Sequence, residues 1–444
     1  MPKTVDNYFL LDYALDRLYT EEINVAQLRE QWHSYCIAKK ESDIIDLYIH
    51  IPFCYSKCTY CMHHSFPTTD PQQMTSHYLF FLEKYLRHFN KAFNTISFAN
   101  VYIGGGTPNI LEEKGLKELR EILASSISLA ENTDGSLYER TGEMNPAWAT
   151  KEQITIMRQM GINRISFGIQ SFCKRTLQKV NRKYTDPDYL NRLVEHAKAI
   201  GVKEVNADLI LGLADEDADD MSRSCKILRS SGVDTITLYT IQEHIDESKL
   251  FTTTQEFYHR IAKIRGRLME ESKAEGFILK ESEDFSETSP AICLYRDRDS
   301  PFQNKYLFHE EKNSVFAVGP GATGKIFGRL RYKNTERLFD RRNLISYGMQ
   351  ITTEDDIASL IISQLNNGEL EESFIIKRFG KGFDGIHTDI FKLLIEREIL
   401  KTVTKKGERS LVWNADSLRE QAVYSLIFFS EDLLKKYRKV TKGY

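Results

Sequence analysis

The segment DLYIHIPFCYSKCTYC, residues 46–61, holds three of the seven cysteines in this chain. A β-rich run, Ile44–Ile51, leads into them, and they follow with the spacing Cys-x3-Cys-x2-Cys at Cys54, Cys58 and Cys61. Three thiolates can hold three irons of a [4Fe–4S] cube and leave the fourth iron open, whereas four cysteines would close it. An open metal position can bind and polarise a substrate. The segment therefore predicts an iron–sulfur site at the end of a strand.

Zinc is the rival interpretation of these thiolates. Structural zinc normally uses two Cys-x2-Cys pairs, and the remaining cysteines are scattered at Cys36, Cys173, Cys225 and Cys293. His63 and His64 lie close enough in sequence to supply a fourth ligand, so the zinc alternative stays open. A third alternative is that the cysteines pack as small apolar side chains.

The bulk properties narrow the class of protein. Seven cysteines in 444 residues are too few for a disulfide framework, which favours a reducing compartment, and we expect a cytoplasmic protein. A formal net charge of −3 favours no nucleic-acid or membrane-surface partner. No apolar run reaches the roughly 18 residues that a membrane span needs, and the N-terminus has no signal-peptide pattern.

Short β-rich runs alternate with amphipathic segments between residues 44 and 240. The expected strands are Ile44–Ile51, Phe98–Ile103, Leu137–Glu143, Arg164–Ile169, Glu204–Leu211 and Thr235–Ile241. The expected helices between them are Ser76–Phe89, Glu113–Ala124, Lys151–Met160, Tyr189–Ile200 and Asp217–Ser230. Such alternation predicts an α/β fold with a parallel sheet. Six strands favour an open, partial (β/α)6 barrel over a closed barrel of eight.

Polar or glycine-rich positions follow the ends of five of these strands. In parallel sheets the ligand lies at the C-terminal strand ends, in the loops that follow. The positions are Cys54 after the first strand, Gly104–Pro108 after the second, Glu143 at the end of the third, Gln170 after the fourth and Asp208 late in the fifth. We therefore expect one site along this rim.

The chain divides into four expected parts. Residues 1–43 form a helical extension, 44–245 the partial barrel, 246–350 an extension with the Gly-rich segment 313–329, and 351–444 a small α+β domain. The Gly-rich segment is expected to return a strand to the core. The last part shows helices at Glu354–Leu365, Glu371–Arg378 and Gly385–Glu396, β-runs at Leu400–Val403 and Ser410–Trp413, and a final helix starting near Asp416. This pattern is winged-helix-like, but no basic stripe for DNA accompanies it.

The cysteine spacing, with Tyr60 before the last cysteine, resembles the hallmark of the radical S-adenosylmethionine (SAM) superfamily. The motif YIHIPFCxxxCxYC resembles one branch of this superfamily more closely. That branch contains the oxygen-independent coproporphyrinogen III dehydrogenases, heme chaperones, an anaerobic heme-degrading methyltransferase and the class C methyltransferases. The similarity runs from about Tyr48 to Tyr239 and more weakly over 313–329 and the C-terminal part. It implies a radical SAM barrel with a [4Fe–4S] cluster that cleaves SAM to methionine and a 5′-deoxyadenosyl radical.

The resemblance also assigns roles to the rim residues. Gly105, Gly106 and Thr107 would contact the methionine part of SAM through backbone groups, although a bare tight turn is the plain alternative. Glu143 would accept hydrogen bonds from a ligand ammonium or ribose, or be a surface glutamate. Arg182, which lies 12 positions after Gln170, would bind the SAM carboxylate through its planar guanidinium group.

The same family resemblance implies further contacts with SAM. Gln170 would help to bind a second SAM. Asp208 would meet a SAM ribose or ammonium, with a structural salt bridge as the alternative. Tyr48 and Tyr60 would lie near SAM and its adenine, or be core tyrosines. The run Gly319–Thr323 would shape the pocket of a second SAM.

The reaction is the least constrained prediction. Gln170 and the late glycine run favour two SAM molecules and a class C-type methyltransferase acting on an aromatic or conjugated acceptor, such as a tetrapyrrole, quinone or heterocycle. Porphyrinogen decarboxylation and heme chaperoning are the alternatives, although the chain lacks the YTSYP-like segment of the dehydrogenases. His63 and His64 follow the last cysteine, and a functional role for them would be to relay protons or to contact heme. The alternative is that they are ordinary polar residues of the loop. A reductant such as flavodoxin or ferredoxin is the expected partner.

Overall fold

The computed structural model describes most of the chain. The described residues are 19–40, 43–131, 138–214, 216–241, 250–278, 291–296, 313–337, 345–366, 369–405, 407–414 and 424–441. Among them, no helix is both long enough and apolar enough to cross a lipid bilayer.

A sheet of twelve strands organises the fold, in the order β1-β14-β13-β12-β11-β2-β5-β6-β7-β8-β9-β10. Its six central strands are parallel and follow one another in chain order. They are β2 (Ile45–Ile51), β5 (Val101–Gly105), β6 (Arg140–Met144), β7 (Arg164–Gln170), β8 (Glu204–Leu211) and β9 (Thr235–Thr240). The α/β class and the six βα strands predicted from hydrophobic alternation are therefore confirmed.

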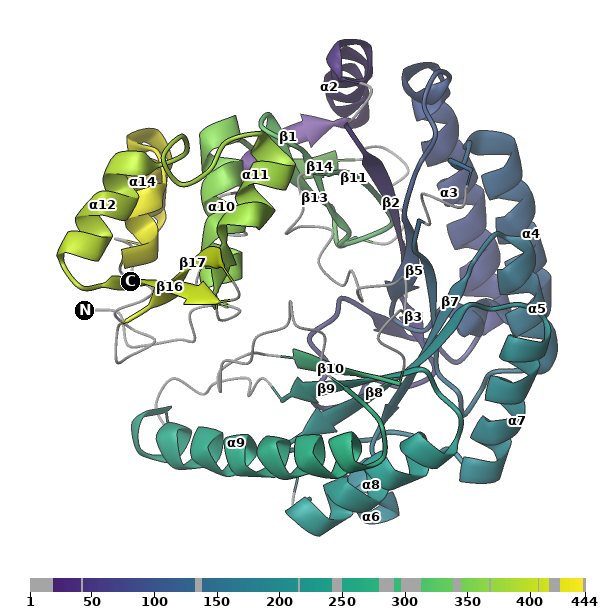
Figure 1. Cartoon of the computed structure of the whole chain (residues 1–444). Coiled ribbons are helices and arrows are strands. Elements are labelled where there is room, and N and C mark those ends of the chain that lie inside the picture. Colours follow the sequence, from purple (N-terminus) through teal and green to yellow (C-terminus); the bar gives the residue numbers. More distant parts are fainter. Residues whose placement is uncertain are drawn as a thin grey trace.

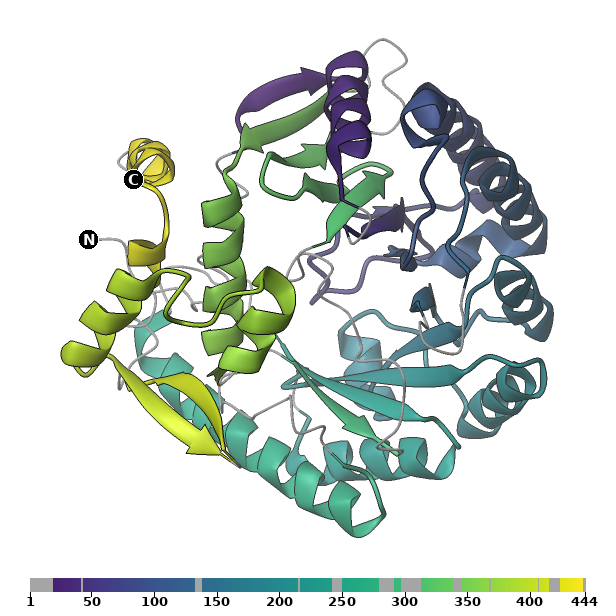
Figure 2. The same ribbon diagram turned by 45° about the horizontal axis from the view of Figure 1, so that its top comes forward.

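Helices cover the outer face of the curved sheet (Figures 1 and 2). They are α3 (Pro71–Phe93), α4 (Glu112–Ser126), α5 (Lys151–Gln159), α6 (Lys174–Lys179), α7 (Pro187–Ala199) and α8 (Ala218–Ser230). Side chains of Asp70, Thr150, Asp186 and Asp217 cap four of these helices at their N-termini. Each such cap stabilises a helix by about 1 kcal/mol. The first of these helices is longer than its apolar stripe indicated, because Asp70 and Pro71 start it.

The glycine-rich segment returns to the core as predicted. Strand β11 (Ser314–Val318) pairs parallel with β2, and β12 (Thr323–Ile326), β13 (Leu330–Asn334) and β14 (Ile345–Gln350) extend the sheet with antiparallel pairs. At the other edge β10 (Ala291–Tyr295) runs antiparallel to β9.

The N-terminal extension differs from the all-helical expectation. Residues Glu21–Asn24 form strand β1, which pairs with β14 from more than 300 positions later. The helix that follows, α2 (Val25–Ala38), starts at a capping box made by Asn24 and Gln27. Residues 1–18 lie outside the described part of the chain. The strand was missed because its partner lies far away in the sequence.

The C-terminal elements follow the predicted pattern and lie opposite α3–α5 (Figures 1 and 2). Helices α10 (Thr353–Asn366), α11 (Glu372–Phe379) and α12 (Thr388–Glu396) pack with a small sheet of β15 (Leu370–Glu371), β17 (Glu408–Trp413) and β16 (Leu400–Lys405) around a second hydrophobic cluster. Helix α14 (Glu431–Thr441) follows. The helix start predicted near Asp416 falls outside the described residues, and the four-part division stays a prediction.

The long helix α9 (Leu250–Ala274) packs against α8 below the second half of the sheet (Figure 1). At the other side of the sheet, buried Arg331 of β13 forms an ion pair with Asp356 of α10 at 2.7 Å. Breaking a buried pair by removing one partner typically costs about 3–5 kcal/mol. This pair therefore holds the first of the C-terminal helices to the main sheet.

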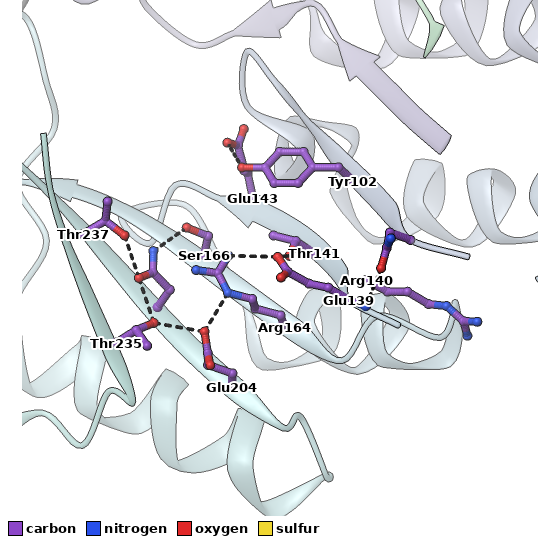
Figure 3. A network of polar contacts seen from close by, with 12 residues as sticks. Tyr102, Glu139, Arg140, Thr141, Glu143, Arg164, Ser166, Glu204, Thr235 and Thr237 are labelled. Atoms are coloured by element: carbon purple, nitrogen blue, oxygen red, sulfur yellow. Dashed lines mark hydrogen bonds and ion pairs between the residues drawn. The ribbon is translucent and has the colours of Figure 1, made fainter. Parts of the chain in front are cut away.

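The inner face of the parallel sheet is polar. Along β8 the side chains of Glu204, Asn206 and Asp208 alternate with apolar residues that belong to the main hydrophobic cluster. Arg164 of β7 donates to Glu204 at 2.8 Å, and Asn206 accepts hydrogen bonds from Thr235 and Thr237 of β9 (Figure 3). Buried polar groups need partners, and this network supplies them beneath the strand ends where the candidate site lies.

Candidate functional site

The three cysteines lie on a closed loop at the end of β2. Strand β3 (Phe53–Cys54) pairs with β4 (Phe66–Pro67), and the amide of Phe66 donates to the carbonyl of Pro52 at 2.7 Å. Cys54 ends β3, while Cys58 and Cys61 follow in the loop. The loop is therefore anchored at both ends, and its thiols are held above the C-terminal strand ends.

All three thiols are free and partly exposed. Burial raises the pKa of the Cys61 thiol, the nearby Lys57 ammonium opposes this effect, and Cys54 and Cys58 add to the increase. Cys54 and Cys58 therefore lie near Cys61 on the same short loop. Gathering thiolates there is unfavourable without a compensating positive charge, which iron supplies.

Two other segments direct donors at the sulfur atoms. The Thr107 hydroxyl lies 3.5 Å from Cys54 Sγ, and Arg182 Nη1 lies 4.0 Å from Cys58 Sγ. Hydrogen bonds and positive charge near sulfur stabilise the thiolate form. Both residues are among the predicted SAM contacts, and the fold brings them next to the cysteine loop.

A loop after α6 clamps the cysteine loop from outside. The amide of Thr59 donates to the Val180 carbonyl at 3.2 Å, and Asn181 Nδ2 donates to the Lys57 carbonyl at 2.9 Å. Asn181 has a φ of 56°, in the left-handed region that asparagine tolerates better than most residues. Sequence reasoning missed this asparagine, although its position directly before Arg182 was the available signal.

The Gly104–Gly106 turn lies tightly under the cysteine loop. The amide of Gly106 donates to the Ile51 carbonyl at 2.7 Å, and a Cβ at Gly106 would lie 2.5 Å from the Phe53 carbonyl oxygen. Gly105 has a φ of 105°, which only glycine adopts readily. The glycines are therefore required by close approach of two backbones at the first strand ends.

Glu143 is fixed beneath this turn. It accepts a hydrogen bond from the Tyr102 hydroxyl at 2.5 Å (Figure 3). It also accepts one from the Gly105 amide at 3.0 Å. Burial raises the pKa of Glu143, and these two hydrogen bonds oppose the increase. The surface-glutamate alternative is therefore wrong for this residue. Tyr102, which positions the carboxylate, was not identified from the sequence.

Asp208 forms an acidic pair with Glu143. Burial raises the pKa of Asp208 to about 6, and the Glu143 carboxylate adds to the increase. Asp208 accepts hydrogen bonds from Asn206 at 2.7 Å and Ser166 at 3.1 Å. Two neighbouring carboxylates, one buried and one half-buried, favour a cation or a group rich in hydrogen-bond donors.

A bulge at the end of β7 sets the backbone at Gln170, another predicted residue, next to Arg182. The register with β8 shifts between Gly168 and Gln170, and Gln170 has a φ of 71°. The Gln170 side-chain oxygen is buried and has no hydrogen-bond partner. Arg182 donates to the Gly168 carbonyl. An unsatisfied buried oxygen next to an arginine is a place where a polar ligand would recover a hydrogen bond.

Tyr48 belongs to a chain of contacts around His50. The Tyr48 hydroxyl lies 2.7 Å from His50 Nδ1, and His50 Nε2 lies 2.7 Å from the His64 carbonyl oxygen. Because a carbonyl only accepts, Nε2 carries the proton and Nδ1 accepts from the tyrosine. His64 in turn contacts the Glu336 carbonyl at 2.9 Å. His50 was missed because it reads as an ordinary strand residue.

The late glycine run lies against these histidines. A Cβ at Gly319 would lie 2.4 Å from the His50 carbonyl oxygen, and one at Gly321 would lie 2.9 Å from the His64 ring. The segment therefore closes one side of the cysteine loop. Tyr60 lies on another side, where burial raises the pKa of its phenol and both Arg182 and Cys58 are close enough to affect it.

The buried state of His50 predicts a pH effect. Burial lowers its pKa to about 4, whereas an unfolded chain has an ordinary value of about 6.5. The unfolded state therefore binds more protons as pH falls, and stability decreases by about 2 kcal/mol between pH 6.5 and 4.5. Urea unfolding at both pH values measures this change. His50→Gln keeps a donor and an acceptor and should remove that part of the decrease; an unchanged pH dependence in the variant would contradict the assignment.

Comparison with known proteins agrees with this geometry. Residues 48–244 match the family model described as the Radical SAM superfamily. Residues 48–244 form a radical SAM domain. The heme chaperone HemW of Bacillus subtilis is 25% identical over 363 residues, covering 80% of this chain and 92% of the relative. An oxygen-independent coproporphyrinogen III oxidase of Salmonella typhimurium is 28% identical over 391 residues, covering 84% and 83%.

The fold of a solved structure matches as well. Coproporphyrinogen III oxidase (HemN) from Escherichia coli superposes with a TM-score of 0.68 at 20% identity, covering 91% of this chain and 93% of that one. The chain therefore shares the fold of HemN, and its similarity to HemW and to coproporphyrinogen III oxidase extends over most of its length. These comparisons favour porphyrinogen decarboxylation or heme chaperoning over the methyl transfer that the sequence led us to expect.

The side chains of the radical SAM domain fit the cofactors that the family implies. A cubane takes each thiolate on a different iron atom, so its three sulfur ligands need not converge on one point. In the described ranges, no three His, Cys, Asp or Glu side chains surround a single-ion position. The free thiols, Arg182, the acidic pair and the unpartnered Gln170 oxygen supply groups for a cluster and for an amino-acid ligand beside it.

Proposed function

We propose that this radical SAM enzyme reductively cleaves SAM at a [4Fe–4S] cluster held by Cys54, Cys58 and Cys61. The observation that carries the proposal is that three free thiols, one arginine and one acidic pair lie along a single rim of the sheet. When bound, the cluster supplies a low-potential electron and an open iron. The chain's own residues orient SAM and exclude water from the site.

Each polar group suits one part of SAM. The Arg182 guanidinium has the planar fork that a carboxylate binds in two bonds. Glu143 and Asp208 complement an ammonium and the ribose hydroxyl groups, and the raised pKa of Asp208 decreases when a positive charge binds nearby. The Gly105–Thr107 backbone offers polar groups to the methionine part. Tyr48 and Tyr60 border the same space.

We propose a tetrapyrrole as the class of substrate. The similarity to relatives named coproporphyrinogen III oxidase and heme chaperone, which covers at least 80% of this chain, supports this class. Our leading reaction is hydrogen abstraction from a porphyrinogen side chain by the 5′-deoxyadenosyl radical, followed by loss of carbon dioxide and transfer of the remaining electron to a one-electron acceptor, which leaves a closed-shell alkene. The shared length with HemW keeps heme binding as the second candidate, and the unpartnered Gln170 oxygen is compatible with a second SAM and methyl transfer.

Product analysis separates these reactions. The anaerobically reconstituted protein is incubated with SAM, dithionite and either coproporphyrinogen III or heme. Decarboxylation yields 5′-deoxyadenosine, methionine and carbon dioxide; methyl transfer adds S-adenosylhomocysteine. Tight heme binding with negligible SAM cleavage indicates the chaperone. Absence of every product and of heme binding would reject the tetrapyrrole class.

Replacing Asp208 by asparagine should change protein stability and SAM binding in opposite directions. The raised pKa of Asp208 means that an ionised carboxylate is unfavourable in the folded state, so stability decreases as the pH rises from about 4, the ordinary pKa, to about 6. Asp208→Asn should therefore stabilise the protein by about 2 kcal/mol at pH 8 and weaken SAM binding at least about tenfold. Thermal unfolding and SAM titration measure the two effects. A destabilised variant with unchanged SAM affinity would instead indicate a purely structural aspartate.

A further inference from the structure

One exposed tryptophan contacts two segments of the candidate site. Trp148 is 38% exposed, so burial in the core does not hold its ring in place. The ring stacks on that of Tyr55, with ring centroids 4.3 Å apart and an interplanar angle of 25°. Lys183 Nζ lies 3.4 Å from the centroid of the same indole ring. The indole therefore contacts one residue of the cysteine loop and one residue of the loop after α6.

The two contacted residues are the immediate neighbours of predicted site residues. Tyr55 directly follows Cys54 in the chain. Lys183 directly follows Arg182, the residue that we assign to the SAM carboxylate. The hydrogen-bonded clamp described above acts on the middle of the cysteine loop. Trp148 instead joins the start of that loop to the segment directly after Arg182.

Hydrogen bonds fix the turn that carries Trp148. Asn109 Nδ2 donates to the Asn145 carbonyl at 3.1 Å, and the Asn145 amide donates to Asn109 Oδ1 at 2.9 Å. The Trp148 amide donates to the Asn145 carbonyl at 3.1 Å, and the Tyr189 hydroxyl donates to the Ala149 carbonyl at 2.6 Å. Because the backbone is held on both sides of the tryptophan, the turn provides a fixed base for the ring.

We propose that Trp148 is a positioning residue, which braces Cys54 and Arg182 through their neighbours and so fixes where both lie for binding SAM. This inference rests on the proposed function and extends it to a residue beyond the proposed ligand contacts. Binding groups keep a productive geometry only when the residues around them are themselves held. Stacking and cation–ring contacts both use the face of an aromatic ring. Phenylalanine can therefore replace the tryptophan, whereas alanine cannot.

Variants of the full-length, anaerobically reconstituted protein test this role. Trp148→Ala removes the ring, and Trp148→Phe keeps an aromatic face. Phe80→Ala is the matched control on α3, because Phe80 is 51% exposed and Lys84 Nζ lies 4.2 Å from its ring centroid. The control removes the same kind of exposed ring and cation–ring contact outside the site. Urea unfolding compares the global stability of the variants.

Hydrogen exchange followed by mass spectrometry measures how firmly both segments are held, independently of activity. The amides of Thr59 and Arg182 donate to backbone carbonyls at 3.2 and 2.8 Å and report on the two segments. In Trp148→Ala, we expect peptides that cover 53–61 and 181–185 to exchange at least about fivefold faster than in the original chain. Trp148→Phe and Phe80→Ala should stay within about twofold of the original chain.

The kinetics of dithionite-driven SAM cleavage provide the second measurement. The KM for SAM should rise at least about fivefold in Trp148→Ala, while kcat per bound cluster changes by less than about twofold. This split is expected because the SAM carboxylate is not part of the bond that breaks. Trp148→Phe should restore the KM, and Phe80→Ala should leave both constants unchanged.

Exchange and KM values for Trp148→Ala within about twofold of the original chain would overturn the proposal. Failure of Trp148→Phe to restore them, or equal effects of Phe80→Ala, would also overturn it, because the ring would then contribute only general stability. If Trp148→Ala does not fold, Lys183→Met removes only the ammonium group over the ring. It should speed exchange in 181–185 and not in 53–61, and unchanged exchange in 181–185 would overturn the proposal. An original chain that neither binds nor cleaves SAM would overturn the proposed function, while the exchange series still decides whether Trp148 braces the two segments.

Discussion

Replacing Cys58 by alanine is expected to remove the brown colour of the anaerobically purified protein and all detectable SAM cleavage. Three thiolates are the minimum set that the proposed cluster uses, and Cys58 is the one next to Arg182. Loss of one ligand leaves two irons without protein ligands. Iron and sulfide assays, the visible spectrum and the release of 5′-deoxyadenosine measure the effect.

Cys36→Ala is the matched control. Cys36 lies on α2, and burial raises the pKa of its thiol to about 11, so it is a poor metal ligand at neutral pH. This variant should keep the iron content and the activity of the original chain. A coloured, active Cys58→Ala protein would refute the assignment of the cluster.

The second large effect is expected from a single added methyl group. In Gly106→Ala the new Cβ would lie 2.5 Å from the Phe53 carbonyl oxygen and 2.9 Å from that of Ile51. Both are backbone atoms, so the turn or the cysteine loop must shift. Overpacking of this kind costs about 1–3 kcal/mol, and a displacement of about 1 Å at a reacting centre can reduce the rate about 100-fold. SAM cleavage per bound cluster and urea unfolding measure the two losses.

Gly266→Ala provides the control for the same chemical change. This glycine lies in α9, where an added Cβ meets no atom within 4 Å. Alanine there should stabilise the helix by about 0.5–1 kcal/mol and leave SAM cleavage unchanged. If Gly106→Ala behaved like Gly266→Ala, the close approach of the turn to the cysteine loop would be wrong.

The part of the fold that is set by local patterns could be predicted from the sequence. Alternating strands and helices gave the six parallel strands, since each pattern is visible within one short segment. Pairing across long distances was not visible: Glu21–Asn24 read as part of a helical stretch, although it pairs with β14. Helix α3 was underestimated because its cap at Asp70 precedes the apolar stripe.

In the candidate site, too, some residues could be predicted from local sequence patterns and others depend on contacts between distant segments. The cysteines, Glu143 and Gln170 stood out because chemically distinctive residues follow strand ends, whereas Arg182 was assigned through the family resemblance alone. Tyr102 and His50 did not, because strand tyrosines and histidines are usually structural. Their importance comes from contacts with Glu143 and Tyr48 that only the folded chain defines.

The predicted reaction illustrates a further limit. Methyl transfer was inferred from Gln170 and the late glycine run, but the glycines are already explained by close packing against His50 and His64. A residue required by packing carries little information about substrate. The similarity to HemW and coproporphyrinogen III oxidase, which extends over most of the chain, is the stronger guide.

The most direct test of the account is a metal and sulfide analysis of anaerobically purified protein, combined with Mössbauer spectra before and after SAM is added. We expect iron and sulfide in equal amounts, near four of each per chain for a [4Fe–4S] cluster. One iron site should change its spectrum on binding SAM. Stoichiometric zinc with negligible sulfide, or a cluster in which SAM alters no iron site, would contradict the account.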